Sequence, residues 1–244
     1  MSEKIKKTPR QKLLDLTFIA LFAALCYIAL TVFFFPFAQM YIHFGNLIVV
    51  VAALLVGGWQ GGLAGSVGMG LFDILNGHAD SAPKTFLLKF LIGITVGAVF
   101  TLFKNRKSYP ATALWISGAV SILIAAALAI PAAKSGYEGK TVVLCPLFIV
   151  VGLICFFFAL LKNKFPQKTA SAIVAASCGM MVNIIGETLW KIVQFSLAGS
   201  SVSAATAAAV LAQGSTLINA GIAVIGGVAL YSALEKPFAK LKKI

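Results

Sequence analysis

Residues 16–72 read LTFIALFAALCYIALTVFFFPFAQMYIHFGNLIVVVAALLVGGWQGGLAGSVGMGLF, 57 residues without one Asp, Glu, Lys or Arg. A helix that crosses a bilayer needs about 20 mostly apolar residues. The stretch therefore holds two or three membrane-spanning helices with uncharged turns between them. A β-barrel would need strands that alternate apolar and polar residues over about 10 positions, whereas this run is apolar on all sides. It predicts an all-α integral membrane protein.

The composition of the whole chain agrees with this fold class. Of the 244 residues, 60% are hydrophobic and 11% are charged, whereas about a quarter of the residues in a soluble domain are charged. The net charge of +13 does not indicate a nucleic-acid partner, because the basic residues flank apolar spans and form no folded basic face.

No motif in the sequence indicates catalysis, a metal or a cofactor. The two histidines lack metal-ligand spacing with Cys or carboxylates, and neither GxSxG nor a phosphate-binding Walker loop is present. The four cysteines lie alone in apolar segments without CxxC spacing, as is typical of core packing. We expect no enzyme, no cofactor and no bound metal, and any ATP-driven step must come from another chain.

Hydropathy and breaker residues predict about eight membrane helices. Their approximate ranges are 13–35, 46–57, 62–76, 84–103, 110–131, 141–161, 169–197 and 204–234. The first ends at Pro36, and a loop, FPFAQMYIHFGN, separates it from the second. The second and third are short for a full crossing, so we expect them to be tilted or buried within the bundle.

The basic residues predict the orientation. Fifteen of the 20 Lys and Arg lie in four clusters, at 4–12, 104–107, 162–168 and 236–243. With eight spans, all four clusters fall on one side, which the positive-inside rule makes cytoplasmic. Both termini are then cytoplasmic, and the loops after the first and third helices lie outside. Removing an adjacent pair of helices leaves this orientation unchanged, so the charges fit six spans as well as eight.

Polar side chains within the spans gather in four regions of the predicted outer half. Ionisable groups inside a membrane are costly and tend to face a cavity or a partner. The regions contain Tyr41, His43, Phe44 and Asn46; Asp73, Lys84 and Lys89; Asn183, Glu187, Trp190, Lys191 and Gln194; and Gln213, Ser215, Thr216 and Asn219. Their convergence favours one outward-facing pocket for a small, flat, polar ligand.

Structural alternatives remain open for the charged groups. Asp73 could neutralise Lys84 or Lys89 and so join the third and fourth helices. Glu187 and Lys191 have the i, i+4 order that favours a pair within one helix. His78 and Asp80 fall in an exposed loop, and we leave them out of the predicted site.

Small residues at four-residue spacing allow close approach of helices. Ala20 and Ala24 have this spacing in the first helix, and the pairs Gly58–Gly62 and Gly61–Gly65, followed by Gly68, have it in the third. Such residues let a second backbone approach closely. The spacing serves either packing within the bundle or docking of a partner.

Several stretches resemble the substrate-binding S components of energy-coupling factor (ECF) vitamin transporters. The resemblance rests on ALFAAL in the first helix, HFGNLIVVVAALLVGGWQGGLAGSVGMGLFDILNG through the next two, APKTFLLKFLIGITVG in the fourth, and VNIIGETLW near the end. It covers about two-thirds of the chain, 13–104 and 169–234. Residues 110–161 depart from the family's pattern and look like an inserted helical pair.

The resemblance implies a six-helix bundle with a two-helix insertion. The chain divides into a basic tail (1–12), the first four helices (13–109), the insertion (110–161) and the last helices with a basic tail (162–244). The family docks a transmembrane coupling subunit on an alanine pair that Ala20 and Ala24 match, and two ATPase subunits complete the importer. This chain is then the vitamin-binding subunit in the plasma membrane. A self-sufficient secondary transporter and a membrane scaffold are the alternative classes.

The resemblance also orders the expected substrates and binding residues. The branch it resembles is associated with riboflavin, pyridoxine and hydroxymethylpyrimidine. We expect a pyridine or pyrimidine vitamin, with pyridoxine first and the other two next. The expected substrate-binding residues are Asn46, Lys84, Asn183, Glu187, Trp190, His43, Gln213 and Asn219. Lys and Glu would bind hydroxyl groups or a ring nitrogen, and Trp190 would stack on the ring.

Overall fold

The computed structural model describes residues 8–37, 40–105 and 166–241, together with isolated positions between 115 and 160. Its elements are α1 (Pro9–Val32), β1 (Phe34–Phe37), β2 (Met40–His43), α2 (Gly45–Leu55), α3 (Gly58–Leu75), α4 (Ala82–Phe103), α7 (Gln167–Leu197), α8 (Val202–Leu211) and α9 (Gly214–Leu241). Among the described residues, four helices, α1, α4, α7 and α9, are long and apolar enough to cross a membrane. The expected all-α membrane fold is confirmed, while the helical pair expected over 110–161 lies almost entirely outside the described residues.

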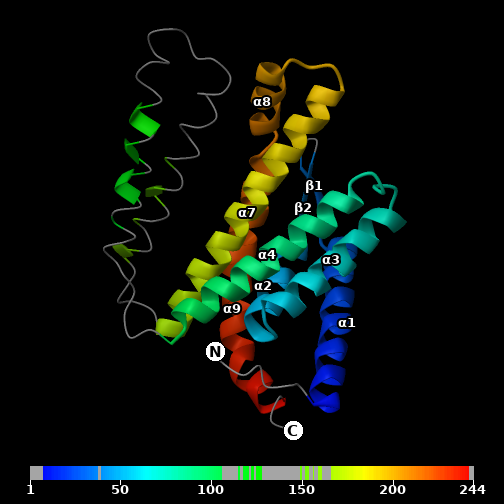
Figure 1. Cartoon of the computed structure of the whole chain (residues 1–244), viewed down its shortest axis with the longest axis vertical. Helices are drawn as coiled ribbons and strands as arrows, with labels where there is room; N and C mark the ends of the chain where they lie inside the picture. The colour runs from blue at the N-terminus through cyan, green and yellow to red at the C-terminus, as the bar shows by residue number, and fades with distance from the viewer. Residues whose placement is uncertain are drawn as a thin grey trace.

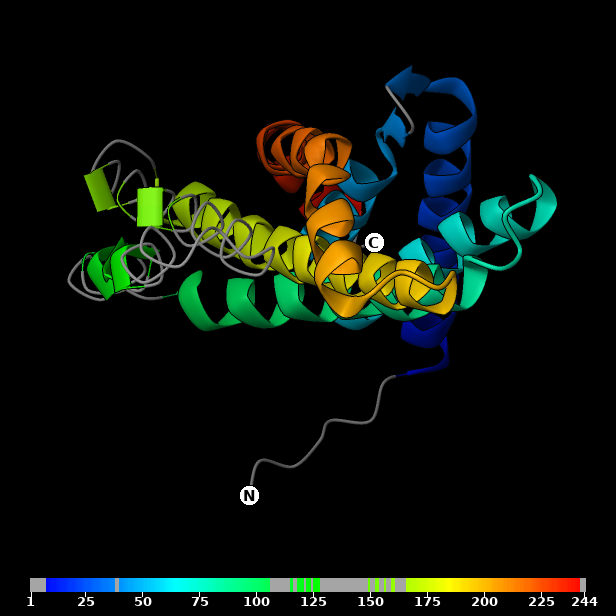
Figure 2. The same ribbon diagram turned by 90° about the horizontal axis from the view of Figure 1, so that it is seen from above.

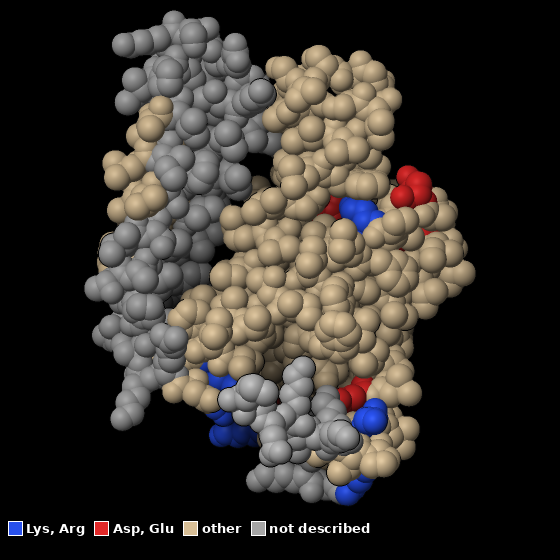
Figure 3. Space-filling view, viewed as in Figure 1, with Lys and Arg blue, Asp and Glu red and all other residues tan. Residues whose placement is uncertain are grey.

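The helices form a bundle whose two ends are built from different elements. The start of α1 and the end of α9 lie at one end, and the β1–β2 hairpin and the α7–α8 turn lie toward the other (Figure 1). α4 packs between α3 and α7, and both views show α4 and α7 running side by side (Figures 1 and 2). On the face shown in Figure 3, one group of charged side chains lies at the lower end and another lies higher up, below the α7–α8 turn, with an uncharged belt between the two groups. That belt is what a bilayer core requires, because a charge there costs several kcal/mol.

The short helix α2 forms the centre of the bundle. Val49, Val50, Val51, Ala52 and Ala53 are each at most 1% exposed, so α2 is buried on every side and packs on α1, α3, α4 and α9. Of the two arrangements expected for a short segment, tilted or buried within the bundle, α2 has the buried one. A helix that is apolar all round has no solvent face to present and must be enclosed.

Glycines bring α3 and α4 into direct backbone contact. A Cβ atom added at Gly93 would lie 2.3 Å from the Cα and N atoms of Gly62, and one added at Gly97 would lie 2.3 Å from the same atoms of Gly58. Both helices therefore present two glycines four residues apart at one interface. The four-residue spacing on α3 was among the predicted contact motifs, whereas the matching pair on α4 was not.

The remaining glycines of α3 serve its other neighbours. A Cβ at Gly61 would meet the backbone of Ala53 in α2, and one at Gly68 would lie 2.2 Å from the carbonyl oxygen of Ala23 in α1. The small residues of α3 thus contact other helices of the bundle. Of the two predicted roles, packing within the bundle and docking of a partner, the structure favours packing.

The segment after α1 differs from the expected loop. The first helix was predicted to continue to residue 35, but α1 ends at Val32 and 34–37 pair antiparallel with 40–43, with Phe34 opposite His43 and Phe37 opposite Met40. The residue before a proline is driven to extended backbone, and three consecutive phenylalanines favour a strand. The hairpin places His43 directly before α2.

The last predicted helix is interrupted. A single helix was expected over 204–234, whereas α8 ends at Leu211 and α9 begins at Gly214. Glycine weakens a helix interior, and side chains satisfy carbonyls freed near the interruption: Lys191 Nζ donates to the Ala212 carbonyl at 2.8 Å, and Gln213 Nε2 donates to that of Ala209 at 3.3 Å. The interruption faces the polar part of α7.

Candidate functional site

A cavity of about 270 Å³ lies between the hairpin, the starts of α2, α4 and α9, and the second half of α7. It is at the end of the bundle opposite the start of α1 and the end of α9. Seven of the eight residues predicted to bind a ligand line it: His43, Asn46, Lys84, Asn183, Glu187, Trp190 and Asn219. Gln213 does not line it, because its side-chain amide turns to the carbonyl of Ala209 at the α8–α9 break.

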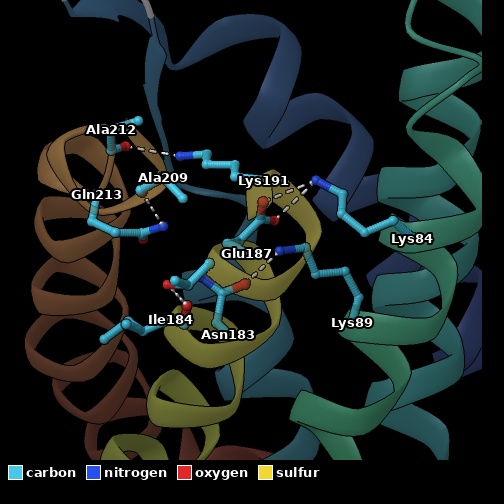
Figure 4. Close-up of polar contacts among 10 residues, drawn as sticks. Lys84, Lys89, Asn183, Ile184, Glu187, Lys191, Ala209, Ala212 and Gln213 are labelled. Atoms are coloured by element: carbon cyan, nitrogen blue, oxygen red, sulfur yellow. Dashed lines mark hydrogen bonds and ion pairs between the residues drawn. The ribbon is translucent and has the colours of Figure 1, made fainter. Parts of the chain in front are cut away.

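The helical period of α7 supplies one wall. Asn183, Glu187, Trp190, Lys191 and Gln194 recur at three- and four-residue steps, so they share one helix face, and all five line the cavity. The α4 wall comes from Lys84, Thr85 and Lys89. Figure 4 shows the lysines of α4 reaching across to the α7 side chains.

The first polar link across the cavity is an ion pair. Lys84 Nζ lies 3.0 Å from Glu187 Oε2 and 3.1 Å from Oε1, and the two side chains are 17% and 15% exposed. Glu187 thus bonds to a lysine of another helix, and not to Lys191 as in the within-helix alternative. Asp73, the other predicted partner of Lys84, is not within ion-pair distance of it. The pair ties the start of α4 to the second half of α7.

The second link lies deeper. Lys89 Nζ donates to Asn183 Oδ1 at 2.9 Å, and both residues are at most 3% exposed. Lys89 and Lys191 were not among the predicted binding residues, although their positions inside apolar helices were a usable signal, since ionisable residues in spans tend to be functional. Ser215 and Thr216 also line the cavity and are buried.

Two hydrogen bonds from a side chain of α9 hold the hairpin in place. Asn219 Oδ1 accepts from the backbone N–H of His43, and its Nδ2 donates to the Tyr41 carbonyl, both at 2.9 Å. Burial, helped by the nearby Lys89 ammonium, lowers the pKa of His43 to about 3. The imidazole is therefore neutral at neutral pH, with one ring nitrogen donating and the other accepting.

Several buried polar atoms around the cavity lack a hydrogen-bond partner. Among the described residues they include His43 Nδ1, Asn46 Oδ1, Trp190 Nε1 and Ser215 Oγ, and all four residues line the cavity. Buried polar atoms are nearly always paired, and leaving one unpaired costs about 1–3 kcal/mol. A ligand with both donors and acceptors, or ordered water, would satisfy them.

We predict that the Lys84–Glu187 pair stabilises the empty protein. Glu187→Gln should lower the free energy of unfolding by about 2 kcal/mol, between the values typical of exposed and of buried pairs, as measured by denaturation in detergent micelles. Lys168 and Glu235 form a matched control pair at the opposite end, where the Lys168 side chain is 58% exposed. Lys168→Met should cost less than about 1 kcal/mol. If Glu187→Gln and Lys168→Met lowered the free energy of unfolding equally, the claim that the more buried ion pair stabilises the protein more would be wrong.

Comparisons with known proteins bear on this site. A family model described as "ECF-type riboflavin transporter, S component" matches residues 10–144, more than half of the chain. A curated protein of Pyrococcus woesei, described as "Uncharacterized protein in gap 3'region", is 37% identical over 62 residues, which are 25% of this chain and 41% of that protein. The chain thus spans about two fifths of the length of this relative. No solved structure matches.

Proposed function

Since the chain belongs to the family of ECF-type riboflavin transporter S components, we propose that its cavity binds a water-soluble vitamin with a single heteroaromatic ring, pyridoxine first. Family membership makes the chain a multi-pass, vitamin-binding subunit of a plasma-membrane importer, a role without catalysis of its own. It also implies association with an energy-coupling module. The choice of vitamin, the binding residues and the orientation belong to the proposal.

The set of unpartnered polar atoms around the cavity is the observation that supports a ligand site. Asn46 Oδ1 can accept from a ligand hydroxyl or N–H, and Trp190 Nε1 can donate to a ligand oxygen or nitrogen. Ser215 Oγ can do either. Trp190, Tyr41 and Phe72 give the same cavity aromatic surface, against which a flat ring can pack. Polar groups that fix orientation within a partly apolar lining are typical of small-molecule sites.

The size of the cavity favours a small vitamin. Its volume of about 270 Å³ is at the lower limit of the range of about 300–1,000 Å³ for pockets that enclose drug-sized ligands. One substituted ring, as in pyridoxine or hydroxymethylpyrimidine, suits it better than the three fused rings and sugar-like chain of riboflavin. Riboflavin remains the alternative substrate.

In the proposed orientation the cavity opens outward. The start of α1 and the end of α9 then lie at the cytoplasmic face, as the basic clusters predict. Vitamin enters from outside, and the coupling module, with a transmembrane subunit and two ATPases, supplies the energy. Ala20 and Ala24 are exposed on α1, while Phe22 and Cys26 of the same helix face the core. The alanine pair is therefore available for the coupling subunit.

Ligand identification and titration test the function. We expect mass spectrometry of the purified, denatured protein to detect a single-ring vitamin, and pyridoxine to bind with a submicromolar Kd. Trp190 should report binding through quenched fluorescence, and Trp190→Phe should remove that signal. Trp59, which is 60% exposed, lies outside the cavity lining, so Trp59→Phe should leave the quenching in place.

Two outcomes would contradict the proposed function. If no vitamin bound to the purified protein, a membrane scaffold would be favoured. If the isolated chain took up vitamin into ATP-free liposomes loaded with an ion gradient, it would be a self-sufficient secondary transporter.

A further inference from the structure

Lys89 is a buried cation that no carboxylate in the described part of the chain neutralises directly. It lies within α4, is 3% exposed and lines the cavity. Its ammonium group donates to the amide oxygen of Asn183 at 2.9 Å. Within 8–37, 40–105 and 166–241 it forms no ion pair. An amide oxygen satisfies one of the three ammonium N–H groups and offsets none of the charge.

Neither carboxylate of the cavity forms an ion pair with Lys89. Both carboxylate oxygens of Glu187 lie within hydrogen-bond distance of Lys84, and Asp73 and Lys89 are not within ion-pair distance of each other. Lys191 donates to the carbonyl of Ala212. Three lysines (84, 89 and 191) therefore face two carboxylates (73 and 187) around the cavity, an excess of one positive charge. His43 does not change this sum, because its imidazole is neutral.

An ammonium group buried without an opposite charge costs free energy, and such residues inside membrane helices tend to serve a ligand or a partner charge. Resting on the proposed function, we infer that the bound vitamin has an ionised oxygen on its ring and directs it at Lys89. The oxygen is either a ring hydroxyl that has lost its proton or a ring carboxylate. Lys89 is thus a further substrate-binding residue and selects for ligand charge.

A hydroxypyridine fits the whole charge pattern. Its ring hydroxyl can transfer a proton to the ring nitrogen, which leaves a negative oxygen and a positive ring N–H. Lys89 binds the oxygen. Glu187 accepts from the ring N–H, because each carboxylate oxygen has two acceptor sites and Lys84 uses one on each. The negative oxygen then lies against the Lys89 ammonium and the positive ring N–H against the Glu187 carboxylate, so each ligand charge meets an opposite charge.

Two pairs of compounds and one substitution test the inference. Pyridoxine is compared with 3-deoxypyridoxine, which lacks the ring hydroxyl, and nicotinate is compared with nicotinamide, which lacks the charge. The first pair tests whether a ring hydroxyl supplies the ionised oxygen, and the second pair tests whether a carboxylate does. Calorimetric titration of the whole chain in detergent should show that the wild type binds the ionised member of one pair about a hundredfold more tightly, as expected for a hydrogen-bonded buried charge pair. Lys89→Met should remove that preference.

The stability of the empty protein separates a binding role from a structural role. Lys89→Met removes an unneutralised buried charge, so its unfolding temperature without ligand should equal or exceed that of the wild type, while the rise on adding the preferred compound should be lost. Lys84→Met serves as the contrast. It removes the ion-pair partner of the Glu187 carboxylate, so it should lower the unfolding temperature of the empty protein.

Three results would overturn the inference. The first is tight vitamin binding that Lys89→Met leaves unchanged. The second is wild-type binding of only neutral compounds, such as riboflavin, nicotinamide or 3-deoxypyridoxine; in both of these cases the vitamin-binding function would stand. The third is binding of no compound, riboflavin and hydroxymethylpyrimidine included, which would overturn the proposed function as well.

Discussion

Replacing Gly93 by alanine is expected to lower the free energy of unfolding by about 3 kcal/mol, the upper end of the cost of overpacking. The added methyl carbon would lie 2.3 Å from the backbone of Gly62. No side chain there can turn away, so α3 and α4 must separate along their whole contact. Gly93→Leu would need several more ångströms, and we expect it to yield no folded bundle.

Size-exclusion chromatography and thermal unfolding in detergent measure this effect. The matched control is Gly221→Ala in α9, because a Cβ atom at Gly221 meets nothing within 4 Å. That variant should be as stable as the wild type or more stable by up to about 1 kcal/mol, since alanine favours a helix over glycine. If Gly93→Ala and Gly221→Ala unfolded at the same temperature, the backbone contact between α3 and α4 would be disproved.

Replacing both Ala20 and Ala24 by tryptophan is expected to abolish vitamin uptake in cells while leaving binding intact. The two alanines are exposed on α1, and large side chains would prevent a coupling helix from approaching the backbone. They do not line the cavity, so the Kd for the vitamin should stay within about threefold of the wild type, a change under about 1 kcal/mol. Co-purification with the transmembrane coupling subunit should fall to background.

The control places a tryptophan on another exposed position. Ile225 of α9 is 76% exposed and also lies outside the cavity lining. Ile225→Trp should retain both co-purification and uptake, which separates a specific docking face from a general effect of bulky residues on membrane insertion. Intact co-purification of the double alanine variant would show that the coupling subunit docks elsewhere.

The sequence predicted the elements of the bundle well where hydropathy alone decides them. α4 and α7 begin within two residues of their expected starts and end where expected. The errors fall where a local signal competes with a long apolar run. The phenylalanines before Pro36 favoured a strand over the end of a helix, and Gly214 interrupted a run that is apolar enough to continue.

The candidate site was predicted in part. Asn183, Glu187 and Trp190 could be placed on one face because the helical period fixes their relative positions, and Asn46 and Asn219 stood out as polar residues in apolar surroundings. The partners could not be assigned in the same way. Glu187 had Lys191 one turn away in the sequence, yet it pairs with Lys84, which is 103 positions away along the chain.

Gln213 and Lys89 show the same limit in opposite directions. Gln213 was expected in the site, but the α8–α9 break turns its amide to a backbone carbonyl. A structural pair between Lys89 and Asp73 was one of the alternatives left open by the sequence, but Asn183 is the hydrogen-bond partner of Lys89. In the first case the neighbour is set by the interruption between α8 and α9, and in the second by the packing of α4 against α7. No local sequence pattern encodes either one.

The sequence by itself determined that this chain is a helical membrane protein, that polar groups gather toward one end, and that α3 has faces of small residues for close packing. These properties follow from the type and period of residues along one helix. Only the tertiary structure decided which helix meets which glycine face, which lysine neutralises Glu187 and which one hydrogen-bonds to Asn183 instead. Such pairings depend on distances between helices, and those distances are set by side-chain volumes summed over whole interfaces.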